Sequence, residues 1–395
     1  MIRRFSNPVP FWIIGLCLIM PRYAVAAGDI SWHGFVAQGV IQASDTNFIE
    51  DDGGVSTKLT EIGLNTSVKL NDSLRLSGQA VYLNGGNRYP EGPRLDYLFL
   101  DWQAISKFDF QLNVHIGRFK NYHWLHSATR DVPHTRPSIV LPQSIYFDSF
   151  RDIGLGNDGI AILSTVNSDV GEWDINWSYG VANISKGQTK NLLGRGAQGN
   201  LQQNFDHKFS IFFRPIDSNW QFAVNIIDTS FNYHRGQLDA LFDGRAEVLR
   251  TQVEFNYERD VWNISGEMMQ EKTAYMGILY PGFVDGTAAQ GGYIQGAYYF
   301  TSALRGIARI DIYDLDKNDR NGMVREQNTG GLFPAYAAYM DNVTLGVQWT
   351  APSNWRIAAE VHRFKGIGRL APVLSPDISN DKYWNLWAIQ VMYWF

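Results

Sequence analysis

"YWNLWAIQVMYWF", residues 383–395, ends the chain and decides the fold. Large apolar or aromatic side chains occupy one parity of this stretch, with Asn385 as its only polar member. A period of two indicates a β-strand with one apolar face. A soluble protein rarely places such a strand at its terminus, where chains fray. The stretch therefore favours a strand whose outer face meets an apolar environment.

The N-terminal segment predicts export from the cytoplasm. It carries two arginines, then the apolar run "FWIIGLCLIM" (11–20), then the small residues of "PRYAVAA". This order is that of a secretory signal peptide, and the apolar run is too short for a membrane span. We expect cleavage after Ala26 or Ala27. Residues 1–26 would then be the signal peptide and residues 27–395 a single mature domain.

Composition narrows the class of protein. Cys17 is the only cysteine, so the exported chain needs no disulfide. Removing Arg3, Arg4 and Arg22 from 34 basic residues leaves 31 against 39 acidic ones, a net charge of about −8, which argues against nucleic acid as a partner. Mean hydropathy is −0.22 and no later run approaches a helical span, yet aromatic residues make up 14%. These features are typical of a transmembrane β-barrel.

Alternating segments recur along the whole mature chain. In one of them, 246–258, Leu249 and Val253 alternate with Arg250 and Glu254. This pattern predicts sixteen strands, near residues 31–44, 57–70, 74–84, 94–104, 110–119, 157–166, 172–184, 204–214, 220–233, 246–258, 261–276, 291–300, 305–315, 339–350, 355–365 and 382–395.

The connections between these segments fall into two alternating classes. Seven are short and rich in Asn, Asp, Ser and Pro, for example "NDS" (71–73) and "ERD" (258–260), whereas the others are longer stretches such as "PGFVDGTAAQGG" (281–292). Short periplasmic turns alternating with long outer loops are typical of porin-type barrels. A soluble two-sheet β-protein would also alternate, but it would not surround a charged interior with so many outward apolar faces. The predicted fold class is an all-β, transmembrane antiparallel barrel of 16 strands.

The last strand has to pair with the first, because an open sheet edge in hydrocarbon would leave backbone groups unpaired. The ending resembles the C-terminal signature of bacterial outer-membrane barrels, a terminal Phe preceded by alternating aromatic or aliphatic residues. The matching positions are Phe395, Tyr393, Val391, Ile389 and Trp387. The resemblance implies that the barrel-assembly machinery reads this strand.

One connection, residues 120–156, is far longer than the others. Loops of this length are usually functional or disordered. Its apolar residues, such as Trp124 and Phe147, can pack, and Pro133 and Pro137 among its prolines reduce its conformational freedom. We therefore expect this long third outer loop to fold into the lumen and narrow it.

The architecture resembles the trimeric Gram-negative porins, and the stretch 117–152 resembles the third-loop region of phosphate-selective-porin-like proteins. The resemblance implies a homotrimer and a constriction formed by residues 118–152, where loop charges face a basic wall. The implied loop residues are Arg130, Asp131, His134, Arg136, Asp148, Arg151 and Asp152. The implied wall residues are Arg75, Arg118, Arg250, Arg309 and Arg356.

The charge of this loop region departs from the common porin pattern. Segment 118–152 holds five Arg or Lys, at 118, 120, 130, 136 and 151, but three Asp, at 131, 148 and 152. Rings of Arg and Lys favour anions, so we expect weak anion preference or near neutrality. In the alternative interpretation, the neighbouring Arg–Asp pairs only fix the loop to the wall.

The predicted function is an outer-membrane porin that lets small hydrophilic solutes and ions diffuse passively, with no cofactor, no metal and no catalysis. The expected partners are outer-membrane lipids and lipopolysaccharide. A substrate-specific channel for phosphate, another anion or sugar is the closer alternative. A barrel enzyme is the minor one, since no Ser, His or Asp spacing supports a catalytic site.

Overall fold

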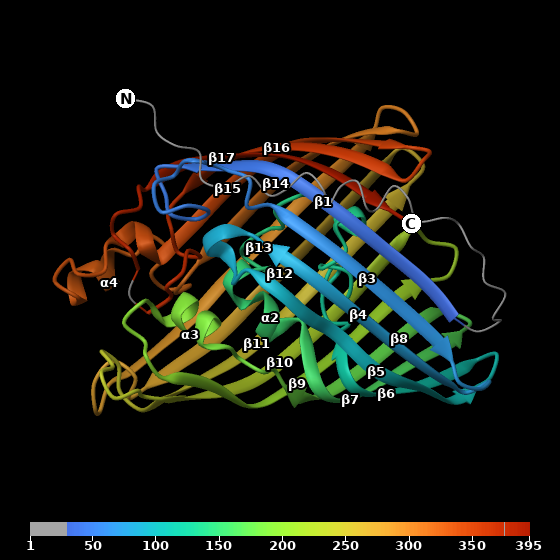
Figure 1. Cartoon of the computed structure of the whole chain (residues 1–395), viewed down its shortest axis with the longest axis horizontal. Coiled ribbons are helices and arrows are strands. Elements are labelled where there is room, and N and C mark those ends of the chain that lie inside the picture. The colour runs from blue at the N-terminus through green and yellow to red at the C-terminus, as the bar shows by residue number, and fades with distance from the viewer. Residues whose placement is uncertain (1–29, 375) are drawn as a thin grey trace.

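The computed structural model describes residues 30–374 and 376–395, without the side chain of residue 152. The predicted signal peptide lies outside these residues. The strands form one closed antiparallel sheet in which β17 returns to β1 (Figure 1). Of its seventeen strands, β2 (Val55–Ser56) has two residues, so sixteen long strands build the wall. The predicted fold class is confirmed.

The long strands are β1 (Ile30–Ser44), β3 (Thr60–Lys69), β4 (Leu74–Asn84), β5 (Gly92–Ser106), β6 (Phe110–Lys120), β7 (Gly156–Ser168), β8 (Gly171–Val181), β9 (Asn200–Pro215), β10 (Trp220–His234), β11 (Gly244–Arg259), β12 (Trp262–Met276), β13 (Val284–Tyr299), β14 (Leu304–Asp314), β15 (Tyr339–Ala351), β16 (Trp355–Lys365) and β17 (Tyr383–Trp394). The helices are α2 (Arg151–Gly154), α3 (Lys186–Leu193) and α4 (Met323–Asn328), with 3₁₀ turns η1 (Gly86–Arg88), η2 (Pro133–Thr135), η3 (Asp148–Phe150) and η4 (Ala335–Ala338). Within the described residues, no helix has the length and hydrophobicity to cross a membrane.

The end of the chain closes the sheet as the sequence predicts. β17 pairs with β1 from Phe35 opposite Trp394 to Ser44 opposite Asn385. Beyond this register the amide of Phe395 donates to the carbonyl of Gly34 at 3.0 Å, and the Gly34 amide donates back at 3.1 Å. A Cβ on Gly34 would lie 2.5 Å from the Phe395 ring, so any larger residue here would displace this ring. The terminal Phe is thus fixed by backbone pairing.

Side chains alternate between the two faces of the wall. In β14, Ile310 and Ile312 are exposed, whereas Arg309 and Asp311 are buried. Because a closed barrel has one exterior and one interior, the buried polar parity faces inward. The exterior is therefore the apolar face expected of a barrel in lipid.

The connections separate into two classes at the two ends of the barrel. All seven short turns lie where the sequence predicts them. α3 and α4 lie among the longer connections at the opposite end, on the left of Figure 1.

Several strand boundaries differ from the prediction by a few residues, and two of these differences are informative. The stretch 281–292 was expected to be a loop, but β13 begins at Val284 and its glycines pair with β12. β8 ends at Val181, and α3 follows, begun by a capping box in which Ser185 and Gln188 satisfy each other's backbone amides. Glycine-rich composition is thus compatible with a paired strand, because neighbouring strands supply the hydrogen bonds.

The main buried cluster lies against the closure of the barrel. Trp384, Leu386 and Ala388 of β17 pack with Ile41 and Ala43 of β1 on the inner side. Apolar residues of the long connection between β6 and β7 belong to the same cluster, among them Ile139, Val140 and Leu141. We call this region, the inner faces of β17 and β1, the closure seam.

Candidate functional site: the long loop and the inner wall

The connection between β6 and β7 spans residues 121–155, and we call it the long loop. It contains only the short elements η2, η3 and α2. Much of it is buried, from Ser138 to Ser149 without interruption. Buried backbone amides and carbonyls need partners, and a loop without regular structure cannot supply them internally. Inward side chains of the wall supply many of them.

The middle of the loop is held by β14 and β16. The amides of Ile139 and Val140 donate to the Glu360 carboxylate at 2.5 and 3.2 Å. The Arg309 guanidinium donates to the hydroxyl of Ser138 at 2.8 Å and to the carbonyl of Val140 at 2.9 Å. Because Glu360 accepts from amides and Arg309 donates to oxygens, this pair satisfies both kinds of backbone group.

A second set of contacts joins the loop to β11, β12 and β14. The Gln143 amide donates to Asp311 at 2.8 Å. The Tyr146 hydroxyl donates to Glu267 at 3.1 Å, and Arg250 donates to the carbonyl of Ile145 at 3.3 Å. Since β6 and β7 flank the loop in sequence, these contacts reach strands far from its own ends in the sheet order.

Ion pairs join the two ends of the loop. Arg130 donates to Asp148 at 2.6 Å, and Asp131 contacts both Lys120 and Arg151. Burial alone would raise the pKa of Asp131, but the charges of Arg151 and Lys120 outweigh it and hold this pKa well below its ordinary value. Asp131 is therefore ionised at neutral pH and fixes the loop ends together.

The predicted loop residues His134 and Arg136 lie near the last strand. Arg136 pairs with Glu61 of β3 at 2.5 Å. The His134 ring stacks on Trp394 with centroids 4.5 Å apart, and its carbonyl accepts from Arg356 at 2.5 Å. Burial lowers the pKa of His134 to about 4, with the charges of Arg356 and Arg136 acting in the same direction. His134 is thus a neutral ring at pH 7.

The structure brings three of the five predicted wall arginines to the loop, namely Arg250, Arg309 and Arg356. Arg75 is exposed near a short turn, and no contact joins it to the loop among the described residues. The side chain of residue 152, the last predicted loop residue, lies outside the described residues.

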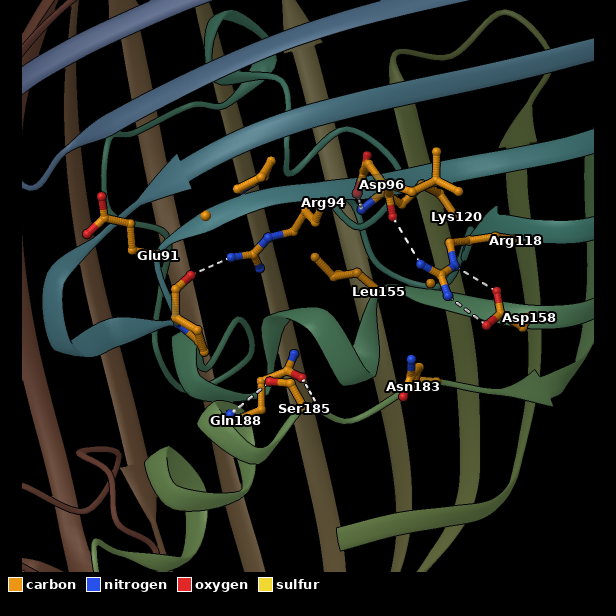
Figure 2. A pocket seen from close by; sticks show the side chains of 16 residues that line it. Glu91, Arg94, Asp96, Arg118, Lys120, Leu155, Asp158, Asn183, Ser185 and Gln188 are labelled. Atoms are coloured by element: carbon orange, nitrogen blue, oxygen red, sulfur yellow. Dashed lines mark hydrogen bonds and ion pairs between the residues drawn. The ribbon is translucent and has the colours of Figure 1, made fainter. Parts of the chain in front are cut away.

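Arg118 lies elsewhere, at a cleft of about 290 Å³ between β5, β6, β7 and the connection at residues 182–199 (Figure 2). The Nε and Nη2 atoms of Arg118 each lie 2.7 Å from a carboxylate oxygen of Asp158. Nearby, Asp96 pairs with Lys120. Figure 2 shows Arg118 directed at Asp158, whereas its neighbour Lys120 also contacts Asp131 of the long loop, so Arg118 itself is not one of the arginines that hold the loop.

Two arginines beside the loop have no carboxylate partner among the described residues. Arg305 donates to the Gln348 side chain at 2.6 Å and reaches the carbonyl of Arg136 at 3.5 Å. Arg356 bonds to Thr350 at 3.0 Å and to the His134 carbonyl. Both are half-buried. These guanidinium groups therefore leave uncompensated positive charge beside residues 134–136 of the loop.

Sequence reasoning missed several residues of this site. They are Glu61, Glu267, Glu271, Asp311 and Glu360, with Arg88, Arg305 and Arg369. The inward parity of the strand residues was a usable signal, since it placed each carboxylate inside. Which of these carboxylates contacts the loop depends on how far the loop extends around the barrel, and no local sequence pattern encodes this extent. The described residues contain no group of three or more His, Cys, Asp or Glu placed to hold a metal ion.

The fold defined above is that of the bacterial porins. Among solved structures, the chain is similar to an anion-selective porin from Comamonas acidovorans, with a TM-score of 0.56 and 12% identity over 93% of this chain and 99% of that one. OmpF of Salmonella typhi gives a TM-score of 0.56 and 11% identity, over 93% and 98% of the two chains. OmpT of Vibrio cholerae gives 0.55 and 13%, over 93% and 97%.

No family model and no curated protein sequence matches the chain. At these identities the structural likeness establishes the fold, and the function has to be argued from the residues.

Proposed function

We propose that the chain is an outer-membrane porin, a water-filled channel through which small hydrophilic solutes and ions diffuse. The long loop crosses the interior and sets the width of the path. The contacts from Glu360, Arg309 and Glu267 to loop groups support this, because they span β12 to β16. Catalysis is not part of the proposal.

The channel has a weak preference for anions. Most charges on the loop are compensated locally, as in the pairs of Arg130 with Asp148 and of Arg136 with Glu61. The loop pairs that were candidates for selectivity therefore mainly fix the loop. The uncompensated guanidinium groups of Arg305 and Arg356 carry the proposal, since fixed cationic groups in a narrow pore attract anions. One structural neighbour is described as anion-selective, so the fold is compatible with such a pore.

The cellular setting follows from the same proposal. The chain is exported by its signal peptide, inserted by the barrel-assembly machinery, surrounded by outer-membrane lipid and lipopolysaccharide, and assembled as a homotrimer. The exposed apolar exterior, for example at Ile389 and Val391, supports the lipid environment.

Reversal potentials across planar bilayers in a KCl gradient test the selectivity. The wild-type protein should give a small potential of the sign for chloride, and the double variant Arg305→Gln, Arg356→Gln should move it toward potassium. Arg363→Gln, an exposed arginine of β16 that contacts Asn385, is the matched control and should leave it unchanged. Clear potassium selectivity of the wild-type protein would contradict the proposal.

A further inference from the structure

Two arginines of the inner wall, Arg305 and Arg356, lie on the strands that flank β15. Arg305 of β14 pairs in register with Gln348, and Arg356 of β16 pairs with Thr350. Because Gln348 and Thr350 are two residues apart in β15, they share the inward face of the sheet with both arginines. With about 4.8 Å between strands and about 3.4 Å per residue, the Cα atoms of the two arginines lie roughly 12 Å apart. Both arginines therefore belong to one patch of the wall.

The guanidinium groups of this pair converge on one turn of the long loop. The Arg356 guanidinium donates to the carbonyl of His134 at 2.5 Å, and the Arg305 guanidinium lies 3.5 Å from the carbonyl of Arg136. Residues two apart in a chain are separated by at most about 7 Å. Both guanidinium groups therefore lie beside the same short segment, within reach of the two ends of one small molecule.

No carboxylate contacts the pair among the described residues. Arg305 donates to the Gln348 side chain at 2.6 Å and to the hydroxyl of Tyr299 at 3.3 Å. Arg356 donates to the hydroxyl of Thr350 at 3.0 Å, and the cation that acts on it is Arg305. Two like charges that are partly removed from water repel each other. The patch therefore favours an anion that compensates both charges.

The pair can be reached from the aqueous interior. The Nη2 atom of Arg356 makes no hydrogen bond to the described residues, and this atom is not buried. The Arg305 side chain is also partly exposed. Arg309 on the same wall differs, because it is 2% exposed and donates to the loop at Ser138 and Val140. Arg305 and Arg356 can therefore contact a solute, whereas Arg309 holds the loop.

We propose that Arg305 and Arg356 together bind short linear dicarboxylates, with one carboxylate at each guanidinium. Guanidinium and carboxylate groups form strong charge-assisted hydrogen bonds. A solute with one charge compensates only one of the two arginines, whereas a short chain with a charge at each end compensates both. This inference rests on the proposed channel function and names a solute class for it.

Single-channel current at pH 8 and constant ionic strength, with added succinate, tests the site. Succinate should reduce the current saturably, at concentrations about tenfold below those at which butyrate does, because its second carboxylate adds a charge-assisted contact. Butane-1,4-diol, which has the same chain without charge, should not block at these concentrations. Equal half-blocking concentrations of succinate and butyrate would overturn the proposal.

Sulfate distinguishes two charges on one compact group from two charges at the ends of a chain. It should block only at higher concentrations than succinate, because a compact group cannot lie at both arginines at once. If sulfate blocked as well as succinate does, the assignment to linear dicarboxylates would be overturned.

Two single variants locate the effect. Arg305→Gln and Arg356→Gln each leave one guanidinium, so each should raise the half-blocking concentration of succinate about tenfold and that of butyrate by less than about threefold. Arg75→Gln is the matched control inside the barrel, since this inward arginine pairs in register with Asp101, and Arg363→Gln is the control on the outer face. Both controls should keep the preference for succinate over butyrate. If both variants of the pair kept it as well, the site would lie elsewhere and the proposal would be overturned.

Calorimetric titration of the detergent-solubilised protein with succinate separates this site from the channel. Binding without any ion current would leave the site standing and contradict the channel. Current without saturable succinate binding would leave the channel standing and overturn the site. The heat-modifiable gel mobility of each variant shows whether it is folded.

Discussion

The closure seam and the wall from β11 to β16 hold the long loop by different means. At the seam, Trp384 and Leu386 present an apolar inner face and belong to the same buried cluster as Ile139 and Leu141 of the loop. On the wall from β11 to β16, charged side chains bond to the loop backbone. Apolar packing therefore stabilises the contact between the loop and the barrel, whereas hydrogen bonds to individual backbone groups fix the path of the loop.

The largest loss of stability is expected when packing at the seam is removed. Trp384 is fully buried, with its ring stacked on Phe364 at 3.7 Å between centroids. Trp384→Ala should lower the free energy of unfolding by about 4 kcal/mol, because a large buried ring leaves a cavity. Trp387→Ala, on the outer face of the same strand, should cost about 1 kcal/mol, since its loss is chiefly the hydrogen bond to Gln42. Urea unfolding followed by gel mobility measures both; equal losses would contradict the difference between the faces.

A smaller loss of stability is expected at β14, on the wall from β11 to β16. Arg309→Gln removes the bonds to Ser138 and Val140 and leaves Asp311 without its nearby cation. It should cost about 3 kcal/mol, in the range for breaking a buried ionic contact, and should increase fluctuations of the single-channel current. Arg363→Gln should stay within about 0.5 kcal/mol of the wild-type protein, as exposed sites usually do. If the Arg309→Gln variant had the current fluctuations and the stability of the wild-type protein, packing alone would fix the loop.

The smallest effect concerns pH. His134 has a pKa of about 4, lowered by burial and by Arg356 and Arg136. A His with a lowered pKa favours the folded state above its ordinary pKa of roughly 6.5, and that stability is lost as pH falls toward 4. Phe35 and Trp394, which face the ring, carry no negative charge that could pair with the protonated ring. His134→Phe should therefore lose less stability than the wild-type protein between pH 7 and pH 4, measured by urea midpoints. If both proteins lost the same stability between pH 7 and pH 4, this role of His134 would be contradicted.

The alternation of residues 383–395 predicted the closing strand because the period of two is a local property. The short turns were predictable for the same reason, since their Asn, Asp, Ser and Pro residues act within a few positions. The start of β13 was not predictable, because the sequence around Gly291 and Gly292 resembles a loop. Only the pairing with β12 and β14, which are distant in the sequence pattern, makes it a strand.

For the candidate site, the sequence identified the long loop but not its partners. Arg305 illustrates why: its inward direction follows from alternation, but its nearness to Arg136 depends on how far the loop reaches.

Single-channel conductance of a protein lacking residues 133–147 tests the central claim that the long loop sets the width of the path. The ends left by this removal lie close together, since Arg130 and Asp148 are paired, so a Gly-Gly link can join them. Removal of the exposed residues 323–332 around α4 is the control. The account predicts a several-fold larger conductance for the first variant and little change for the second. An unchanged conductance in a folded protein without residues 133–147 would contradict it.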